Sequence, residues 1–430
     1  MAEAERERKP LGFWACWSLT VGVMIGSGVF MLPAVLAPYG LISFGGWLIT
    51  GGGSILLALV LGRLAARTTR TGGPYVYAHD AFGDLTGFLV VWGYWISYCL
   101  AVPAIAIAFV GYLGVFLPVI ASSALWQATV ALALIWMLTL VNVRGVRESA
   151  AVQIWMTLLK IAPLVLVIGW GVVAGDVANL PVFNTEGAAL APTLAATALL
   201  TMWAFSGLEA GVIPAGSVAD SERVIPRAVV TGTIAVTVIY LAATAAVMLL
   251  VPAGQLAQST SPFADAAHAL GPWGADLIAA AALVATAGAM NGCIFITGQL
   301  PMAAARDGLA PSMLARCNAG GSPHIALLVS GVIGSLLLLA NYSRGLMGAF
   351  TFLLMMSTIT VLAPLLVSAL AELRHSWRAA RGWAIVAAFA GVYALFAIIG
   401  SGAEVIGWGV VLLIAGLPLY ALLKHRRNAA

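Results

Sequence analysis

Long runs of apolar residues follow one another along almost the whole chain. A bilayer core about 30 Å thick requires roughly 20 apolar residues for each helical crossing. Hydrophobic residues make up 62% of the chain and charged residues 8%, whereas soluble domains carry about 25% charged residues. The natural solvent of most of this chain is therefore lipid. We count twelve apolar spans, over residues 12–36, 41–62, 84–116, 121–143, 149–174, 190–215, 226–251, 272–304, 324–341, 346–371, 383–400 and 404–423.

Inside a bilayer every backbone amide and carbonyl needs a partner within the protein, so the spans are helices or strands of a closed barrel. The runs lack the alternation of apolar and polar residues that barrel strands have. The sequence predicts an all-α integral membrane protein with twelve transmembrane helices. The four cysteines have no C-x-x-C spacing and the five histidines are scattered, so we expect no disulfide, metal or other cofactor.

Lysine and arginine determine the orientation of membrane spans, because cytoplasmic loops carry an excess of both. With the N-terminus inside, 18 of the 20 basic residues are cytoplasmic, Arg344 alone lies in an outside loop, and Lys160 lies within a span. The 18 residues are Arg6, Arg8, Lys9, Arg63, Arg67, Arg70, Arg144, Arg147, Arg223, Arg227, Arg306, Arg316, Arg374, Arg378, Arg381, Lys424, Arg426 and Arg427. We therefore expect a multi-pass protein of the plasma (inner) membrane with both termini cytoplasmic.

The net charge of +4 follows from this topology, so we expect no nucleic-acid partner. Five acidic residues fall in the predicted outside loops or at the adjoining ends of spans and are interpreted as solvated loop charges. They are Asp176, Glu186, Asp265, Asp276 and Glu404.

Two spans contain small polar residues at mid-depth. The first span contains Gly26-Ser27-Gly28, and the sixth contains Ser206-Gly207. Small residues allow membrane helices to pack closely. Alternatively, the helices break there, and the freed amides of a half-helix bind an anion. Interrupted spans at corresponding places in two halves indicate a substrate site in inverted-repeat transporters, so the pairing favours a break in both spans.

Five segments resemble the amino acid–polyamine–organocation transporters, in order and over the whole chain. They are IGSGVFMLP (25–33), TGGPYVYAHDAFG (71–83), FSGLEA (205–210), SERVIPRA (221–228) and AAARDGLAP (303–311). The resemblance is closest to the basic amino acid and polyamine antiporter branch. It implies a five-plus-five inverted repeat with discontinuous helices one and six, alternating access, and often a homodimer.

On this resemblance the chain divides into tails, a transport core and added helices. Residues 1–11 form a cytoplasmic N-terminal tail, and residues 12–371 form a ten-helix core. Repeat one covers about 12–174 and repeat two about 190–371. The remainder comprises two additional helices at 383–423 and a cytoplasmic C-terminal tail at 424–430.

The resemblance also implies a set of substrate-binding residues. The substrate carboxylate, or its surroundings, would meet Met24, Ser27 and Gly28, and carbonyls near Trp203 and Ser206 would accept hydrogen bonds from its amino group. Trp203 would also act as a gate. The other implied pocket residues are Ile25 and Gly26 in span one, Phe205 and Gly207 in the unwound part of span six, Tyr94 in span three and Ser357 in span ten.

Two positions depart from the arginine/agmatine branch of the family. Cys293 stands where that branch has a tryptophan that sandwiches the guanidinium group, and Val102 stands where it has an asparagine. Both departures weaken arginine as a substrate. A more apolar pocket favours a neutral amino acid.

Lys160 and Glu209 are ionisable residues within predicted spans, and such residues usually mark transport or proton pathways. Glu209 either ties the broken sixth helix to its neighbours or relays a gating change. Lys160 lies too deep to reach the membrane surface easily, and a lysine without water can load and release a proton. In some branches of the family a lysine of the fifth helix replaces a sodium ion, so we expect Lys160 to couple transport without sodium.

The sequence therefore predicts a secondary active amino acid transporter that works by exchange or proton coupling. A polyamine or cationic amino acid antiporter of the same fold is the alternative, although the pocket spans offer Glu209 as their single anion. A non-transporting receptor or enzyme is a remote alternative, because the interiors of the spans contain no histidines or paired carboxylates. The chain also lacks a phosphate-binding G-x-x-x-x-G-K-[ST] motif, so we expect no ATP-driven transport by this chain.

Overall fold

The structure is a computed structural model that describes residues 12–67, 73–145, 150–185, 187–212, 218 and 220–429. Several predictions lie outside these residues: the 1–11 tail with Arg6, Arg8 and Lys9, and the loop residues Arg70, Arg147 and Glu186. The side chains of Arg426 and Arg427 are not described either.

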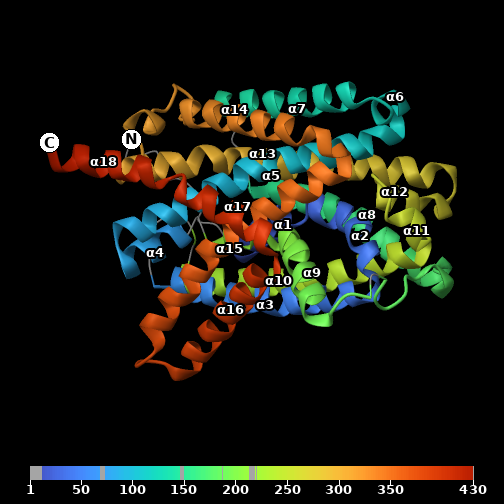
Figure 1. The fold of residues 1–430 in the computed structure, drawn as a ribbon, viewed down its shortest axis with the longest axis horizontal. Coiled ribbons are helices and arrows are strands. Elements are labelled where there is room, and N and C mark those ends of the chain that lie inside the picture. Colours follow the sequence, from blue (N-terminus) through green and yellow to red (C-terminus); the bar gives the residue numbers. More distant parts are fainter. Residues whose placement is uncertain are drawn as a thin grey trace.

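The described elements are all helices, and the long ones form one bundle (Figure 1). In the first half they are α1 (Phe13–Met24), α2 (Ser27–Leu36), η1 (Ala37–Ile42), α3 (Ser43–Ala65), α4 (Pro74–Phe82), α5 (Asp84–Phe116), α6 (Pro118–Ala121), α7 (Ala124–Arg144), α8 (Ala150–Ala174) and η2 (Val177–Asn179). In the second half they are α9 (Leu190–Phe205), η3 (Leu208–Gly211), α10 (Ser221–Leu250), α11 (Ala253–Leu256), α12 (Pro262–Ala267), η5 (His268–Leu270), α13 (Pro272–Arg306), η6 (Ser312–Ala315), α14 (His324–Asn341), η7 (Tyr342–Arg344), α15 (Gly345–Ser376), α16 (Arg381–Gly400), α17 (Ala403–Ile414) and α18 (Leu417–Ala429).

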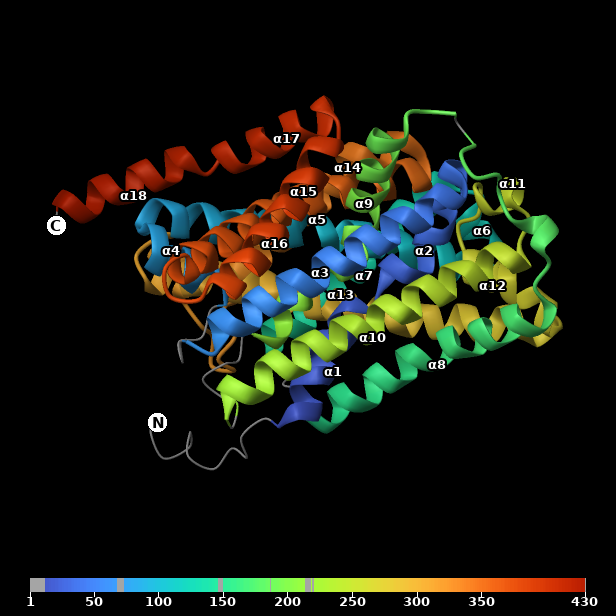
Figure 2. The ribbon, with the colours of Figure 1, turned by 90° about the horizontal axis from the view of Figure 1, so that it is seen from below.

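Ten stretches of the described residues are helical, long and apolar enough to cross a membrane. Their burial identifies the centre and the edge of the bundle. The most apolar part of the first stretch, Phe13–Ala65, is 89% buried within the protein, and that of Ala403–His425 is 11% buried. Figure 2 shows α17 and α18 along one edge. The prediction of an all-helical membrane protein is confirmed, and its core lies around α1, α2 and the helices packed against them.

The break predicted in the first span is present. Helix α1 ends at Met24, Ile25 and Gly26 have non-helical backbone angles, and α2 begins at Ser27. The interruption is therefore Ile25-Gly26, and Ser27 and Gly28 already belong to the first turn of the second half-helix, α2. A β-carbon on Gly28 would lie 2.9 Å from the Cα atom of Ala204, so glycine allows α2 to approach α9 this closely.

The break predicted in the sixth span is also present. Helix α9 ends at Phe205, Ser206 is extended, and Gly207 has a left-handed backbone with φ of 103°. Glycine adopts this conformation without steric cost. A β-carbon on Gly207 would lie 2.4 Å from Cγ1 of Val23, so this break packs directly against α1. Each interrupted span therefore packs against the other beside its break.

The last predicted span, 404–423, contains a break that the sequence did not indicate, between α17 and α18. The indole N–H of Trp92 donates to the carbonyl of Leu412 at 2.8 Å. That carbonyl would otherwise accept from the amide of Gly416 in a continuous helix. A β-carbon on Gly416 would lie 2.8 Å from the Trp92 ring. The tryptophan therefore replaces the amide of Gly416 as the donor to Leu412 and also packs directly against Gly416.

Candidate functional site

A small closed cavity lies between the two interrupted helices. Its volume is about 40 Å³, and a single water requires roughly 10–15 Å³ by the same measure. The cavity therefore has room for a few waters. Its lining residues are Val23, Met24, Gly26, Ser27, Gly28, Ser97, Tyr98, Ala101, Ile105, Trp203, Ser206, Glu209, Ala289, Cys293, Ser357 and Val361.

The cavity brings together most of the residues implied by the resemblance. Eight of the twelve predicted substrate-binding residues line it: Met24, Gly26, Ser27, Gly28, Trp203, Ser206, Cys293 and Ser357. Glu209 lines it as well. The residues Ile25, Tyr94, Phe205, Gly207 and Lys160 do not line it, and all five lie in or beside the segments that form its walls.

Helix α5 lines the cavity one turn beyond Tyr94. Tyr94 was predicted to shape the pocket, but Ser97 and Tyr98 line the cavity. Residues three and four positions apart share one helix face, so the spacing from Tyr94 was the available signal. Ser97 donates to the carbonyl of Ser357 at 2.9 Å, and Ser357 donates to the carbonyl of Ser97 at 2.8 Å, which joins α5 to α15 beside the cavity.

One end of the cavity is suited to an anion. Ser27 and Gly28 form the first turn of α2, and the N-cap residue Gly26 has no side chain to bind their amides. The first amides of a helix have no partner within it, and the helix dipole is positive at that end. The hydroxyl of Ser206 also lines the cavity, and it is buried without a hydrogen-bond partner. These donors together fit a carboxylate.

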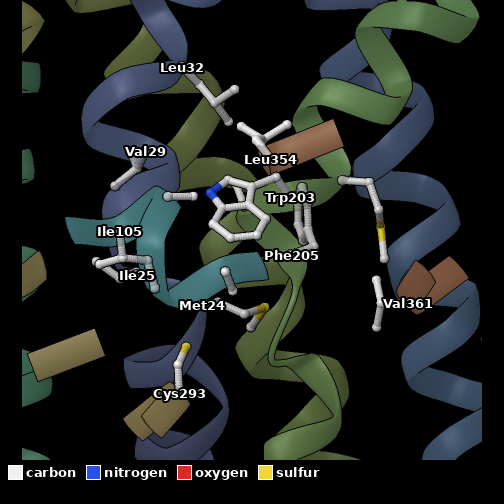
Figure 3. Close-up of a cluster of buried hydrophobic side chains, with 14 of the residues drawn as sticks. Met24, Ile25, Val29, Leu32, Ile105, Trp203, Phe205, Cys293, Leu354 and Val361 are labelled. Atoms are coloured by element: carbon white, nitrogen blue, oxygen red, sulfur yellow. The ribbon is translucent and has the colours of Figure 1, made fainter. Parts of the chain in front are cut away.

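The opposite walls are mostly apolar. In the view of Figure 3, Trp203 lies between Leu32 and Leu354 on one side and Met24 and Cys293 on the other. Trp203 is 5% exposed. Its ring is therefore part of the apolar lining of the cavity.

Glu209 contributes a carboxylate whose two oxygens are both engaged. The hydroxyl of Tyr98 donates to Oε1 at 2.8 Å, and the amide of Gly207 donates to Oε2 at 3.2 Å. Glu209 is 2% exposed, so these bonds replace the water that its charge would otherwise require. They also attach the unwound segment after α9 to α5.

Lys160 reaches the broken end of α1 from α8. Its ammonium donates to the carbonyl of Gly22 at 2.8 Å, and Lys160 is 4% exposed. Gly22 lies in the last turn of α1, where the break leaves carbonyls without partners in the helix. A cation is favourable at this negative end of the helix dipole. Lys160 therefore stabilises the interrupted form of the first span.

Tyr240, on α10, connects the two interruptions and was not predicted from the sequence. Its hydroxyl lies 2.6 Å from the carbonyl oxygen of Met24 and 3.0 Å from that of Ala204. One hydroxyl hydrogen is thus shared between the last turns of α1 and α9. Tyr240 is fully buried, so few other donors can reach these carbonyls.

We expect Tyr240→Phe to reduce uptake several-fold while the protein still folds. Leaving a buried carbonyl without a donor costs about 1–3 kcal/mol, and here the cost falls on the broken helix ends rather than on a helix interior. Initial uptake rates in reconstituted vesicles, with size-exclusion profiles as the folding control, measure this effect. Uptake equal to that of the unmodified protein would show that the shared bond has no role in transport.

Comparisons with known proteins agree with this geometry. The family model described as amino acid permease matches residues 11–421. A putative arginine/ornithine antiporter of Bacillus subtilis strain 168 is 30% identical, with 98% of each chain covered. The cadaverine/lysine antiporter of Escherichia coli K12 is 32% identical over 75% of this chain and 73% of its own, and the putrescine transporter PotE of the same strain is 30% identical over 95% and 94%.

The family and these relatives are transporters in membranes, and the relatives are named for basic amino acids and polyamines. The match extends over both interrupted helices and over every helix that lines the cavity. This chain is a multi-pass membrane transporter that belongs to the amino acid permease family.

Proposed function

We propose that this permease carries a small neutral amino acid by alternating access, with no requirement for sodium. The observation that carries the proposal is the chemistry of the cavity. The amides of the α2 N-terminus fit a carboxylate, and Ala101, Ile105 and Val361 are among the apolar residues that line the cavity. A small apolar side chain fits such a lining.

The proposed core is the five-plus-five inverted repeat over residues 12–371, followed by two additional helices at 383–423. It is supported by the two interrupted helices, each of which begins one of the proposed repeats. The twelve-helix count is supported by the two 53-residue apolar stretches, Phe13–Ala65 and His324–Ser376, since each contains two long predicted spans. We further propose cytoplasmic termini, from the distribution of lysine and arginine, and a homodimer, from the family resemblance.

In the proposed mechanism Lys160 couples transport to the arrangement of the first helix. With its ammonium on the carbonyl of Gly22, the inner half-helix is held in the closed arrangement. Loss of the proton removes the charge from this bond and weakens it, since bonds from charged donors are roughly twice as strong as neutral ones. Both substrate exchange and proton symport are compatible with this role of Lys160.

A cationic amino acid or polyamine is the second candidate substrate, because the relatives are named for such compounds and Glu209 lines the cavity. Among the described residues that line the cavity, Glu209 is the one acidic side chain, and Tyr98 and Gly207 already bind it. A polyamine, moreover, would leave the α2 amides without a carboxylate. We therefore rank the neutral amino acid first.

A thermal-shift screen of the purified protein against all amino acids and common polyamines tests this ranking. We expect L-alanine or L-leucine to raise the melting temperature and L-arginine to have no effect. Stabilisation by polyamines alone would replace the proposed substrate class with the second candidate.

A further inference from the structure

A second, larger depression lies farther out along the two helices that form the cavity. Its volume is about 490 Å³, within the range of roughly 300–1,000 Å³ that is typical of small-molecule sites. Helices α2 and α15 contribute Val35, Thr351 and Met355 to its lining. The remaining walls come from the segments around η1, α11, η7 and the start of α17.

The depression and the cavity share two helices, at different heights along each. A helix rises 1.5 Å per residue, so Val35 lies about 10 Å along α2 from Gly28, and Thr351 lies about 9 Å along α15 from Ser357. Between these levels Leu32 and Leu354 are both fully buried. Both lie beside the Trp203 ring in Figure 3, within the buried core.

The depression contains one positive and one negative side chain, Arg344 and Glu404. The guanidinium carbon of Arg344 lies 4.1 Å from the centre of the Phe352 ring, and this cation–π contact holds the charge at the wall. Glu404 lies in the first turn of α17, where the helix dipole favours an acid. Within the described part of the chain, no ion pair within 4.0 Å joins Arg344 to Glu404 or involves either residue.

Two unpaired charges of opposite sign in one depression complement a zwitterion. From this arrangement we infer that the depression is an outer binding site for a free amino acid, with Arg344 facing its carboxylate and Glu404 its ammonium group. The inference rests on the proposed function, since it takes the same substrate class. An amino acid held here lies about 10 Å along α2 from the residues of the inner cavity. Charges at a rim act mainly on the association rate and its salt dependence.

Transport kinetics from the two faces of the membrane test the inference. In vesicles with the protein in a single orientation, initial rates are measured with radiolabelled L-alanine and L-leucine supplied on either side. We expect Arg344→Gln and Glu404→Gln each to raise the KM for outside substrate three- to tenfold, with kcat and the KM for inside substrate unchanged. The matched control Asp276→Asn removes another predicted outside acid that does not line the depression, and it is expected to change neither KM.

Several outcomes would overturn the inference. An unchanged outside KM in both variants, or an equal rise on both faces, removes the outer site. A defect that appears in phosphatidylethanolamine vesicles and disappears in phosphatidylglycerol vesicles assigns the depression to a zwitterionic lipid headgroup. If the unmodified protein carries arginine or putrescine but neither probe, the proposed substrate class itself fails, and this is seen before any variant is made.

Discussion

Lys160→Ala is expected to reduce uptake at least tenfold and to remove the pH dependence of any uptake that remains between pH 5 and pH 8. The ammonium of Lys160 donates to the carbonyl of Gly22, and the alanine variant leaves that carbonyl at the broken end of α1 without its donor. Such a loss costs about 1–3 kcal/mol, and each 1.4 kcal/mol is tenfold in an equilibrium. The variant also lacks the ammonium group to which the proposed coupling assigns the proton.

Initial uptake rates across this pH range, normalised to the amount of protein in the membrane, give the result. Thr157→Val is the matched control, because Thr157 also lies on α8 and donates to α1, at the carbonyl of Ser18, 3.1 Å away. It removes a neutral bond and keeps the charge, so its uptake should keep the pH profile of the unmodified protein. If Lys160→Ala has normal uptake at every pH, Lys160 has no coupling role.

The interruptions could be predicted from the sequence because glycine and serine are costly in the middle of an apolar helix. Gly26, Gly28 and Gly207 are sites where a helix former would otherwise stand. The residues at which the helices end and resume around each interruption were harder to predict from the sequence. The residue at which α2 resumes depends on how closely α2 and α9 approach, and that contact joins residues about 180 positions apart, such as Gly28 and Ala204.

Tyr240 and the outer depression could not be predicted, for a related reason. Tyr240 is a single tyrosine in an apolar helix, and nothing in its own neighbourhood in the sequence indicates that it meets Met24, 216 residues away. Arg344 and Glu404 each look like a solvated loop charge when they are read alone. Their significance arises from the packing of α17 against α15, which brings the two charges to the same depression.

The second large effect is expected for Trp203→Ala, which should lower uptake about a hundredfold. The indole lines the cavity and lies beside Leu32 and Leu354, and as the predicted gate it would cover the cavity on their side. Without the ring, a substrate in the cavity keeps contact with water on that side. Closure of a site is often what commits a bound molecule to the next step, so this loss acts on transport more than on folding. Uptake kinetics in vesicles, with the melting temperature measured in parallel, separate the two effects.

Two variants sharpen the result for Trp203. Trp203→Phe keeps an aromatic ring at the lid and should retain more uptake than Trp203→Ala, because the ring area covering the cavity is only partly lost. Trp126→Ala removes a tryptophan that is 53% exposed on α7 and does not line the cavity, so it should transport normally. Normal kinetics in Trp203→Ala would mean that the cavity between the two broken helices is not the path of the substrate. If Trp203 acts as a lid, uptake falls about a hundredfold in Trp203→Ala and is partly retained in Trp203→Phe.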